Sequence, residues 1–388
     1  MQTRIPAVAV AGVLLSCGGM ARTVSFKTIY SFNGADGSEP AANLIRDAAG
    51  NFYGTAYAGG SGNNGAVFKL DSTGHETVLY NFTGGADGGT PRAGLVLDSS
   101  GNLYGTTELG GDLSNFEVCP AGCGVVFKLD PAGTETVLYT FQGGADGAEP
   151  FAGVIRDSAG NLYGTTFSGG FSGSEDCSPG GCGVVFQVDT AGAETVLYTF
   201  HDGLEGAGPM SPLVADAAGN LYGDTPEGAS SFGSVFRLDT AGNFTILHAF
   251  TGGKDGGGPS ALTRDAAGNI YGATDIGGTA NFGVVFELSP TGSETVLHNF
   301  TGGTGGYYSF TGVILDSAGH LYGSTFKGGA HNGGVIFRLS PAGKYLAYSL
   351  PRRSGGANTN LLLVGRQVYG TCSAAGAHRD GYVFKALF

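Results

Sequence analysis

The sequence predicts an all-β fold, a seven-bladed β-propeller of four-stranded antiparallel blades, from three observations. An apolar-Tyr-Gly triplet recurs seven times at intervals of 47 to 59 residues, a period typical of propeller blades and solenoid coils. Each copy contains four short apolar runs separated by turn signals. The two ends of the chain are incomplete copies that complement each other. The triplet tyrosines are Tyr53, Tyr104, Tyr163, Tyr222, Tyr271, Tyr322 and Tyr369.

The four apolar runs of one copy are predicted to be β-strands, named a, b, c and d, because they are rich in β-branched and aromatic residues. The a–b connection reads Asp-x-x-Gly-Asn in six copies, with His320 replacing Asn in one of them. Asp opens a type I turn and Gly supplies the positive φ of a tight hairpin. The c–d connection has the same form, so each copy is a four-stranded meander. In the second copy the strands are predicted over Gly94–Asp98, Asn102–Thr107, Gly124–Asp130 and Glu135–Phe141.

The chain ends favour a closed ring over a solenoid. The last copy supplies strands a, b and c over Asn360–Val364, Gln367–Thr371 and Tyr382–Leu387, but has no strand d. The first recognisable piece, Val24–Phe32, is a strand d without the other three. An isolated blade cannot bury both of its apolar faces, so blades must pack on one another. We therefore expect the N-terminal strand to complete the last blade, with strand d outermost if strand a is nearest the axis.

Residues 1–22 are predicted to be a signal peptide or lipoprotein leader, and residues 23–388 a single propeller domain. Arg4 precedes an eleven-residue apolar run, Ile5–Leu15, which is too short to span a bilayer. Leu14-Leu15-Ser16-Cys17 resembles a lipobox, which would lipidate Cys17; ordinary cleavage somewhere within Ser16–Arg22 is the alternative. We expect an exported protein that is extracellular, periplasmic or lipid-anchored at the cell surface, with no transmembrane segment.

The composition agrees with an exported β protein. Only 13% of residues are charged, the net charge is −13, and 74 of 388 residues are glycines that follow the repeat. An acidic chain without Lys/Arg clusters is a poor nucleic-acid binder, so we expect no nucleic-acid partner. The pattern shows no second domain, and a monomer is expected.

Four cysteines lie in two equivalent b–c loops. We predict the disulfides Cys119–Cys123 and Cys177–Cys182, as is usual for an oxidising compartment. A four-cysteine zinc site is the alternative, because the spacings are near those of structural zinc ligands. Cys372 replaces a strand b threonine and is expected to be a buried small residue.

The recurring Gly-Asn-Leu-Tyr-Gly-Thr-Thr, followed by Gly-Val-Val-Phe-Lys-Leu and Glu-Thr-Val-Leu-Tyr-Thr-Phe, resembles the GloVer (Gloeobacter–Verrucomicrobia) tandem repeat of "choice-of-anchor" bacterial surface proteins. The resemblance covers almost the whole chain after the leader. It implies export and a surface anchor, which in this chain would be Cys17, and it implies no catalytic residues.

The tight a–b and c–d turns share one face of the ring, so the b–c and d–a loops share the other, where length and chemistry vary. The d–a loops repeat Gly-x-Asp-Gly-x-x-Pro, with Glu205 in the place of Asp in one copy. A ring of carboxylates could bind Ca²⁺, although each loop offers only one. The alternative, which we favour, is that Asp-Gly forms the turn. The calcium candidates are Asp36, Asp87, Asp146 and Asp255.

Two repeated aromatic positions are assigned to structure. The triplet tyrosines are expected to pack between blades, with partners for their hydroxyls. His248 and His298 replace tyrosine in strand d and are expected to be structural as well.

The loops of blades 6 and 7 break the repeat and bring basic and aromatic residues to the variable face. Blades 2 and 3 place acidic residues there instead, namely Glu108, Asp112, Glu117, Glu175 and Asp176. The basic sector is predicted to bind an anionic or carbohydrate ligand, with Arg on carboxylates and Tyr under sugar rings. Divergent, merely solvated loops are the alternative. The predicted ligand-binding residues are Tyr307, Tyr308, Lys327, His331, Arg352, Arg353, His378 and Arg379.

The sequence favours a non-enzymatic interaction or glycan-binding module whose partner is a polysaccharide or a cell-surface protein. The alternative is a polysaccharide lyase or glycoside hydrolase acting on an acidic polysaccharide. In that case His378 or His331 would act as base and Tyr307 or Tyr308 as acid, with Arg352 or Arg353 neutralising a uronate. No catalytic residue is otherwise assigned, and apart from calcium no cofactor is predicted.

Overall fold

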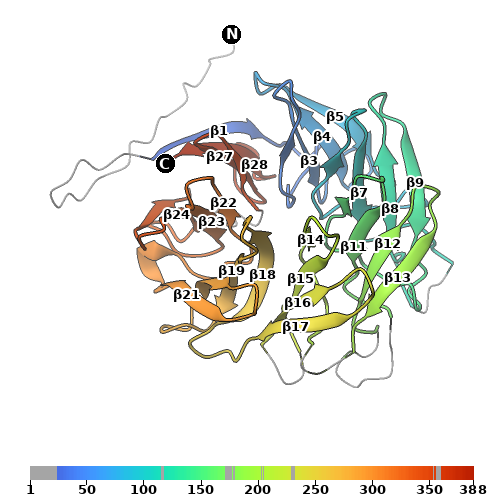
Figure 1. Ribbon diagram of the computed structural model, residues 1–388. Coiled ribbons are helices and arrows are strands. Elements are labelled where there is room, and N and C mark those ends of the chain that lie inside the picture. The colour runs from blue at the N-terminus through green and yellow to red at the C-terminus, as the bar shows by residue number, and fades with distance from the viewer. Residues whose placement is uncertain are drawn as a thin grey trace, which may run out of the picture.

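The computed structural model describes residues 24–388 except 115–117, 171–176, 178–179, 202, 204, 229–231, 353 and 355–359. Seven four-stranded antiparallel sheets form a ring of blades around a central axis (Figure 1). This is the predicted seven-bladed propeller. Within each blade the hydrogen-bonded order is a, b, c, d, and the d strands lie at the outside of the ring.

The strands fall into four sets according to their position in the blade. The a strands are β2 (Ile45–Arg46), β6 (Val96–Leu97), β10 (Ile155–Arg156), β14 (Val214–Ala215), β18 (Gly257–Arg264), β22 (Ile314–Leu315) and β26 (Leu362–Val364). The b strands are β3 (Phe52–Ala56), β7 (Leu103–Thr107), β11 (Leu162–Thr165), β15 (Leu221–Thr225), β19 (Ile270–Ile276), β23 (Leu321–Thr325) and β27 (Gln367–Cys372). The c strands are β4 (Ala66–Leu70), β8 (Val125–Leu129), β12 (Val184–Val188), β16 (Ser234–Leu238), β20 (Val284–Leu288), β24 (Val335–Leu339) and β28 (Tyr382–Leu387). The d strands are β5 (Glu76–Asn81), β9 (Glu135–Thr140), β13 (Glu194–Thr199), β17 (Phe244–Ala249), β21 (Glu294–Asn299), β25 (Tyr345–Ser349) and β1 (Ser25–Ser31).

The ring closes as predicted. Strand β1 pairs antiparallel with β28, from Ser25 opposite Leu387 to Ser31 opposite Tyr382. In Figure 1 the blue N-terminal strand accordingly lies beside the red C-terminal strands. Phe26 stacks on Phe384 of its own blade at 5.2 Å between ring centroids and on Tyr348 of blade 6 at 5.3 Å. The N-terminal strand therefore contributes both hydrogen bonds and core packing to the last blade.

The hydrophobic core lies between neighbouring blades. Phe141, at the end of one strand d, meets Phe186 of the next blade edge to face at 5.1 Å, a favoured geometry for aromatic pairs. Inside each blade the strand c phenylalanine covers the triplet glycine: a Cβ on Gly105 would lie 2.8 Å from Cζ of Phe127. The glycine of the Tyr-Gly pair is therefore required, because the phenylalanine ring occupies the space that a side chain would need. The equivalent phenylalanine pairs are Phe32–Phe68, Phe82–Phe127, Phe200–Phe236, Phe250–Phe286 and Phe300–Phe337.

The a–b hairpin aspartate binds the triplet tyrosine of its own blade. In blade 2 the Asp98 carboxylate accepts hydrogen bonds from Asn102 N–H (2.9 Å), Asn102 Nδ2 (2.8 Å) and the Tyr104 hydroxyl (3.0 Å). Gly101 closes the turn at a φ of 86°. We call this arrangement the hairpin clasp. It recurs between Tyr53 and Asp47, Tyr163 and Asp157, Tyr222 and Asp216, Tyr271 and Asp265, and Tyr322 and Asp316.

The inner strands differ from the prediction in length. In blade 2 the a strand is predicted over Gly94–Asp98, but only Val96–Leu97 pair with β7. The other end of β7 bonds elsewhere: Thr106 Oγ1 donates to the carbonyl of Ala152 in blade 3 (2.9 Å), and Thr107 Oγ1 donates to that of Leu109 (2.9 Å). At Thr106 a contact with the next blade thus takes the place of pairing with the a strand of its own blade.

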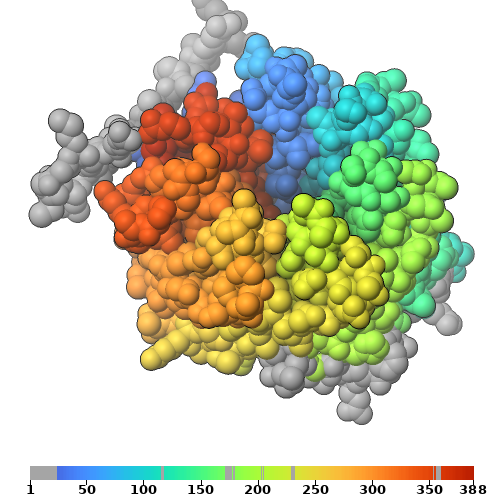
Figure 2. Space-filling model, viewed as in Figure 1, coloured from blue at the N-terminus to red at the C-terminus, as the bar shows by residue number. Residues whose placement is uncertain are grey.

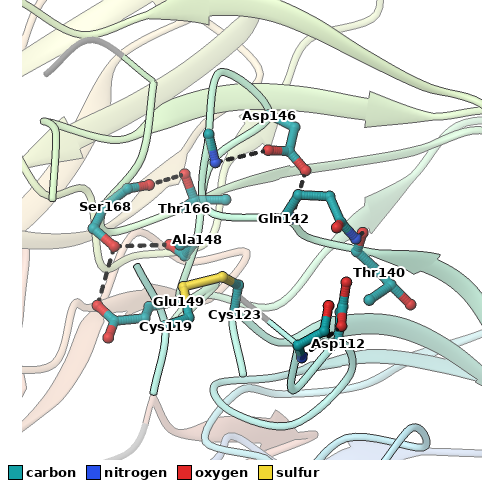
Figure 3. The surroundings of a disulfide bond; sticks show 12 residues. Asp112, Cys119, Cys123, Thr140, Gln142, Asp146, Ala148, Glu149, Thr166 and Ser168 are labelled. Atoms are coloured by element: carbon teal, nitrogen blue, oxygen red, sulfur yellow. Dashed lines mark hydrogen bonds between the residues drawn. A yellow bond between two sulfur atoms is a disulfide. The ribbon is translucent and has the colours of Figure 1, made fainter. Parts of the chain in front are cut away.

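The two predicted disulfides are present, with Cα–Cα distances of 5.3 Å for Cys119–Cys123 and 5.0 Å for Cys177–Cys182. The first packs against the following d–a loop, where a Cβ on Gly143 would lie 2.7 Å from Sγ of Cys123 (Figure 3). In that loop Asp146 accepts a hydrogen bond from Gln142 N–H (2.8 Å). The disulfides therefore brace b–c loops against d–a loops. Cys372 is buried, as expected.

Among the described residues, no helix combines the length and apolar character that crossing a membrane would require.

Candidate functional site

The blades meet around a hollow at the axis of the ring (Figure 2). A cavity of about 430 Å³, the axial cavity, lies where the d–a loops turn into the inner strands. Its lining includes Arg92, Phe151, Met210 and Phe310, from four different blades. Arg92 lies over the Phe151 ring at 5.0 Å and forms an ion pair with Glu108 at 3.4 Å.

A second cavity, of about 530 Å³, adjoins the axial cavity and shares Met210, Ser211 and Phe310 with it. We call it the blade 4–5 pocket, because its walls come mainly from the ends of β15, β18 and β19 and from the loop after β15. Three acidic side chains line it, and no Lys, Arg or His is among its described lining residues. The acidic residues are Asp224, Glu227 and Asp275, and the large apolar ones are Met210, Phe232, Ile276 and Phe310.

Strand β18 shapes one wall of this pocket. It is eight residues long, whereas the other inner strands have two or three, and a bulge lies between Ser260 and Thr263. The extra length pairs Gly257 with Ile276 of β19. Gly258 has a φ of 63°, and a Cβ there would lie 2.0 Å from Oδ1 of Asp275. Glycine at this position therefore leaves room for the Asp275 carboxylate.

Asp224 occupies a position that holds threonine in four other blades. In three of these the hydroxyl donates to a carbonyl of the next blade: Thr55 to Ala93 (2.9 Å), Thr106 to Ala152 (2.9 Å) and Thr371 to Ala42 (3.3 Å). The hydroxyl of the fourth, Thr165, has no hydrogen-bond partner among the described residues. An ionised carboxylate cannot donate at all. The repeat therefore gives no structural reason for an aspartate here.

The Asp224 side chain is buried without a bonding partner. The residue is 1% exposed, and neither carboxylate oxygen has a partner with hydrogen-bond geometry among the described residues. Burial raises the pKa of Asp224 from 3.8 to about 7, and the neighbouring Ser211 hydroxyl only partly opposes this rise. That hydroxyl accepts a hydrogen bond from Ala261 N–H (2.8 Å), which leaves its own proton available to a neighbouring acceptor. An unpartnered buried carboxyl destabilises the fold unless something else binds it.

Asp275 is the second carboxyl group with a shifted pKa in the pocket. Burial raises its pKa from 3.8 to about 6, and the negative charge of Glu227 raises it as well, while its own N–H and that of Ile276 lower it. Its Oδ1 is buried without a partner among the described residues. Two such carboxyl groups in one cavity can accept hydrogen bonds from a ligand, hold a cation or exchange a proton.

The predicted basic and aromatic sector is only partly assembled. Tyr307 contacts Phe282 at 5.0 Å and Tyr308 at 4.9 Å, and the Lys327 ammonium lies 4.5 Å from the centroid of the Phe326 ring. The remaining predicted residues are exposed and line neither cavity, and among the described residues no hydrogen bond, ion pair or ring contact joins them to this cluster. These are His331, Arg352, His378 and Arg379. Arg353, Glu117, Glu175, Asp176 and Cys17 lie outside the described residues.

The d–a loop aspartates bond within their own loops. Asp87 accepts hydrogen bonds from Thr83 N–H (2.8 Å), the Thr83 hydroxyl and the Tyr80 hydroxyl (3.0 Å). Asp36, Asp146 and Asp255 likewise accept backbone N–H groups of Asn33, Gln142 and Thr251. No group of three or more His, Cys, Asp or Glu in the described part of the chain is placed to hold a metal ion. These carboxylates fasten strand d to its loop.

Sequence reasoning missed Asp224 and Asp275. A signal was present, because Tyr-Gly-Asp-Thr interrupts the Tyr-Gly-Thr-Thr pattern at Asp224. Asp275 gives a weaker signal, since the equivalent position already varies widely, with Tyr57, Glu108 and Phe167 in blades 1 to 3. That both carboxyl groups line one cavity follows only from the packing of blade 4 on blade 5.

Comparison with solved structures finds the same fold in several other proteins. Among solved structures, virginiamycin B lyase from Staphylococcus aureus is similar with a TM-score of 0.63 at 12% identity, covering 94% of this chain and 100% of that one. An extracellular domain assigned to a one component system of B. thetaiotaomicron gives 0.57 at 13% identity, covering 95% of this chain and 42% of that one. Puromycin hydrolase gives 0.57 at 14% identity, covering 87% and 50%. At these identities the likeness concerns the propeller fold alone.

No curated protein sequence matches the chain at a significant level. The family model described as the Gloeobacter/Verrucomicrobia repeat matches residues 11–174 and 117–315, which is most of the chain. The matched segments contain five complete blades and both disulfide loops. The chain therefore belongs to the Gloeobacter/Verrucomicrobia repeat family.

Proposed function

We propose that this protein is an exported, non-enzymatic β-propeller that binds a glycan through the face carrying its b–c and d–a loops. The observation that supports this most directly is Asp224, a buried carboxyl group without a partner among the described residues, in a cavity that also exposes aromatic rings. Sugar hydroxyls donate hydrogen bonds to carboxylates, and the apolar faces of sugar rings pack on aromatic side chains. The blade 4–5 pocket offers both kinds of group.

Export is part of the proposal. Two disulfides support it, since disulfides persist mainly in oxidising compartments. The mature protein would be extracellular, periplasmic or held at the cell surface through Cys17. A cell-surface protein is the other partner that the exposed loop face would suit.

The charge of the pocket bears on the kind of glycan. Three acidic side chains and no basic one among the described lining residues would repel the carboxylates of an acidic polysaccharide. A neutral or positively charged glycan fits this pocket better. The exposed Arg352, His378 and Arg379 form a separate candidate surface for an anionic glycan.

A glycan-array screen of residues 23–388 tests the proposal, with wild type compared with Asp224→Asn. We expect wild type to bind a defined set of glycans and the variant to lose them while retaining its circular dichroism spectrum. A parallel screen with chelator tests whether Asp36, Asp87, Asp146 and Asp255 take part through calcium. Absence of glycan binding by wild type across pH 5 to 8 would contradict the proposal.

A second function, that of a glycan-degrading lyase or hydrolase, is favoured by one observation. Asp224 and Asp275 line the same pocket with pKa values of about 7 and about 6, and such groups can act as general acid and base near neutral pH. Incubation of each bound glycan, with detection of new reducing ends and unsaturated uronates, tests this alternative. Turnover lost in Asp275→Asn would assign it to this pocket, whereas turnover lost in His378→Ala or His331→Ala would assign it to the basic sector.

A further inference from the structure

The blade 4–5 pocket has an unbalanced charge. Its described titratable lining residues are Asp224 from β15, Glu227 from the loop after β15 and Asp275 from β19. The nearest basic residue along β18, Arg264, lies at the far end of that strand, where its guanidinium is 5.1 Å from the Tyr222 ring. The described lining thus presents acceptors and negative charge without a protein cation.

We propose that this pocket binds the protonated amine of an amino sugar, with Asp224 as the buried counter-ion of the ammonium group. The inference rests on the proposed glycan-binding function and names the chemical class of the glycan. An ammonium group brings three N–H donors and one positive charge, which are what the partnerless oxygens of Asp224 and Asp275 lack among the described residues. Charge-assisted hydrogen bonds of this kind are about twice as strong as neutral ones.

The cost of placing Asp224 in the core supports this assignment. Thr106, at the same repeat position, bonds a carbonyl of the next blade (2.9 Å), so a threonine would satisfy the fold locally. Asp224 instead leaves two buried oxygens without partners in the described part of the chain. Removing a carboxylate from water is costly, and a bound cation is the group that offsets this cost best.

The arrangement suits an organic cation better than a metal ion. Among the described residues, no three of the His, Cys, Asp and Glu side chains are close enough together to hold a metal. The carboxyl groups of the pocket instead come from two segments, with Asp224 and Glu227 at the end of β15 and just after it, and Asp275 on β19. Around them lie Met210, Phe232 and Phe310, which are 44%, 49% and 52% exposed and can pack against the carbon framework of a sugar. Aromatic faces also attract an ammonium group.

Binding of an amino sugar should depend on pH through both the pocket and the ligand. Asp224 and Asp275 have raised pKa values, so both lose their protons as the pH rises from 5 to 8, but the amine of an amino sugar, whose pKa is lowered by the oxygens of its ring, also loses its proton toward the upper end of this range. Glu227 faces the same cavity and adds negative charge. Binding of an amino sugar is therefore expected to be tightest at an intermediate pH and to weaken toward both pH 5 and pH 8, whereas binding of a neutral sugar should change little.

Calorimetric titration with three disaccharides that differ only at C2 tests the inference. These are the chitosan disaccharide, which has amines, N,N′-diacetylchitobiose, which has amides, and cellobiose, which has hydroxyls. Each is titrated into wild type, Asp224→Thr, Asp275→Asn and the control Glu135→Gln. Glu135 lies on the outer strand β9 and also has a pKa raised to about 7, so it matches Asp224 in titration but not in position. Benzylamine serves as an amine without a sugar.

We expect wild type and Glu135→Gln to bind the chitosan disaccharide at least about tenfold more tightly than the other two, a difference of about 1.4 kcal/mol. Asp224→Thr should abolish the preference, and Asp275→Asn should weaken it. Equal binding of all three disaccharides would overturn the inference and leave the proposed glycan function standing. Binding of benzylamine alone, dependent on Asp224, would leave the ammonium site standing and contradict the glycan function. Absence of binding by every probe would overturn the inference, and the glycan function would then be decided by the array screen.

Discussion

At the scale of single residues, aspartates at two positions of the repeat have opposite effects on stability. Burial would raise the pKa of Asp98, but its carboxylate accepts four hydrogen bonds, three in its hairpin clasp and one from Ser100 N–H, and these hold the pKa below the usual value. Asp224 accepts none from the described residues, so burial raises its pKa to about 7. The first kind of aspartate stabilises the blade, and the second weakens it unless a ligand is bound.

Replacing Asp224 by threonine is expected to stabilise the free protein. The substitution replaces a buried carboxylate, which has no hydrogen-bond partner among the described residues, with the hydroxyl found at this position in other blades. The free energy of unfolding at pH 8 should therefore rise by about 1 to 3 kcal/mol. The gain should shrink as the pH falls to 5, because the folded state then holds this carboxyl protonated. Urea unfolding at both pH values measures it. A variant less stable than wild type at pH 8 would show that Asp224 has a structural partner.

The hairpin clasp makes a second prediction. Tyr104→Phe removes the hydroxyl bonded to Asp98 and should lower the free energy of unfolding at pH 7 by about 1 kcal/mol. The loss should diminish only as the pH falls past the usual aspartate pKa to the lowered pKa of Asp98, where wild type protonates this carboxylate and weakens the same bond. Tyr369→Phe is the matched control, because the Tyr369 hydroxyl donates to the neutral Gln367 amide (2.6 Å). Identical pH profiles for the two variants would argue against a charged clasp.

At the scale of elements, the outer d strands carry a second set of carboxyl groups with raised pKa values. Four d strands begin with a half-buried glutamate whose pKa is raised to about 7, first by burial and then by the negative charge of a d–a loop aspartate. The pairs are Glu76 with Asp36, Glu135 with Asp87, Glu194 with Asp146, and Glu294 with Asp255. These strands therefore become less stable as their glutamates ionise.

The whole protein is consequently expected to be more stable at pH 5 than at pH 8. A carboxyl group with a raised pKa is protonated in the folded state but ionised in the unfolded state between about pH 4.5 and 7, so stability falls across this window. Chemical unfolding of wild type and Glu135→Gln at intervals from pH 5 to 8 measures the slope, which should be shallower in the variant. Equal slopes would mean that Glu135 stays solvated, and a wild type that is more stable at pH 8 would contradict the expectation for the whole set.

At the scale of the whole molecule, closure depends on the N-terminal strand. β28 is central in its blade only because β1 covers its outer edge. Without β1, the Phe384 ring, which is fully buried, loses its contact with Phe26, and backbone groups of β28 are left unpaired. An exposed strand edge with apolar neighbours is a site of aggregation.

Deleting residues 24–31 should therefore cost more than any single substitution above. We expect the melting temperature to fall by roughly 10 °C or more and the protein to self-associate. Thermal melts and light scattering measure both effects, with a chain that begins at Val24 as control. A truncated chain that stays monomeric with an unchanged melting temperature would show that the ring does not need this strand.

The sequence by itself determined the number of blades, the four strands of each, the closure of the ring and the two disulfides. These follow from local, repeated patterns: hairpin turns such as Asp98–Asn102, apolar runs and cysteine pairs four and five residues apart. Tertiary structure alone decided the short inner strands, the tyrosine partner of each clasp and the cavity that Asp224 and Asp275 both line. The pocket is made by two neighbouring blades and an extended β18, so its environment depends on packing between residues about fifty positions apart. Whether a carboxyl group is buried, and hence whether its pKa is raised, is set by that packing rather than by its neighbours in the chain.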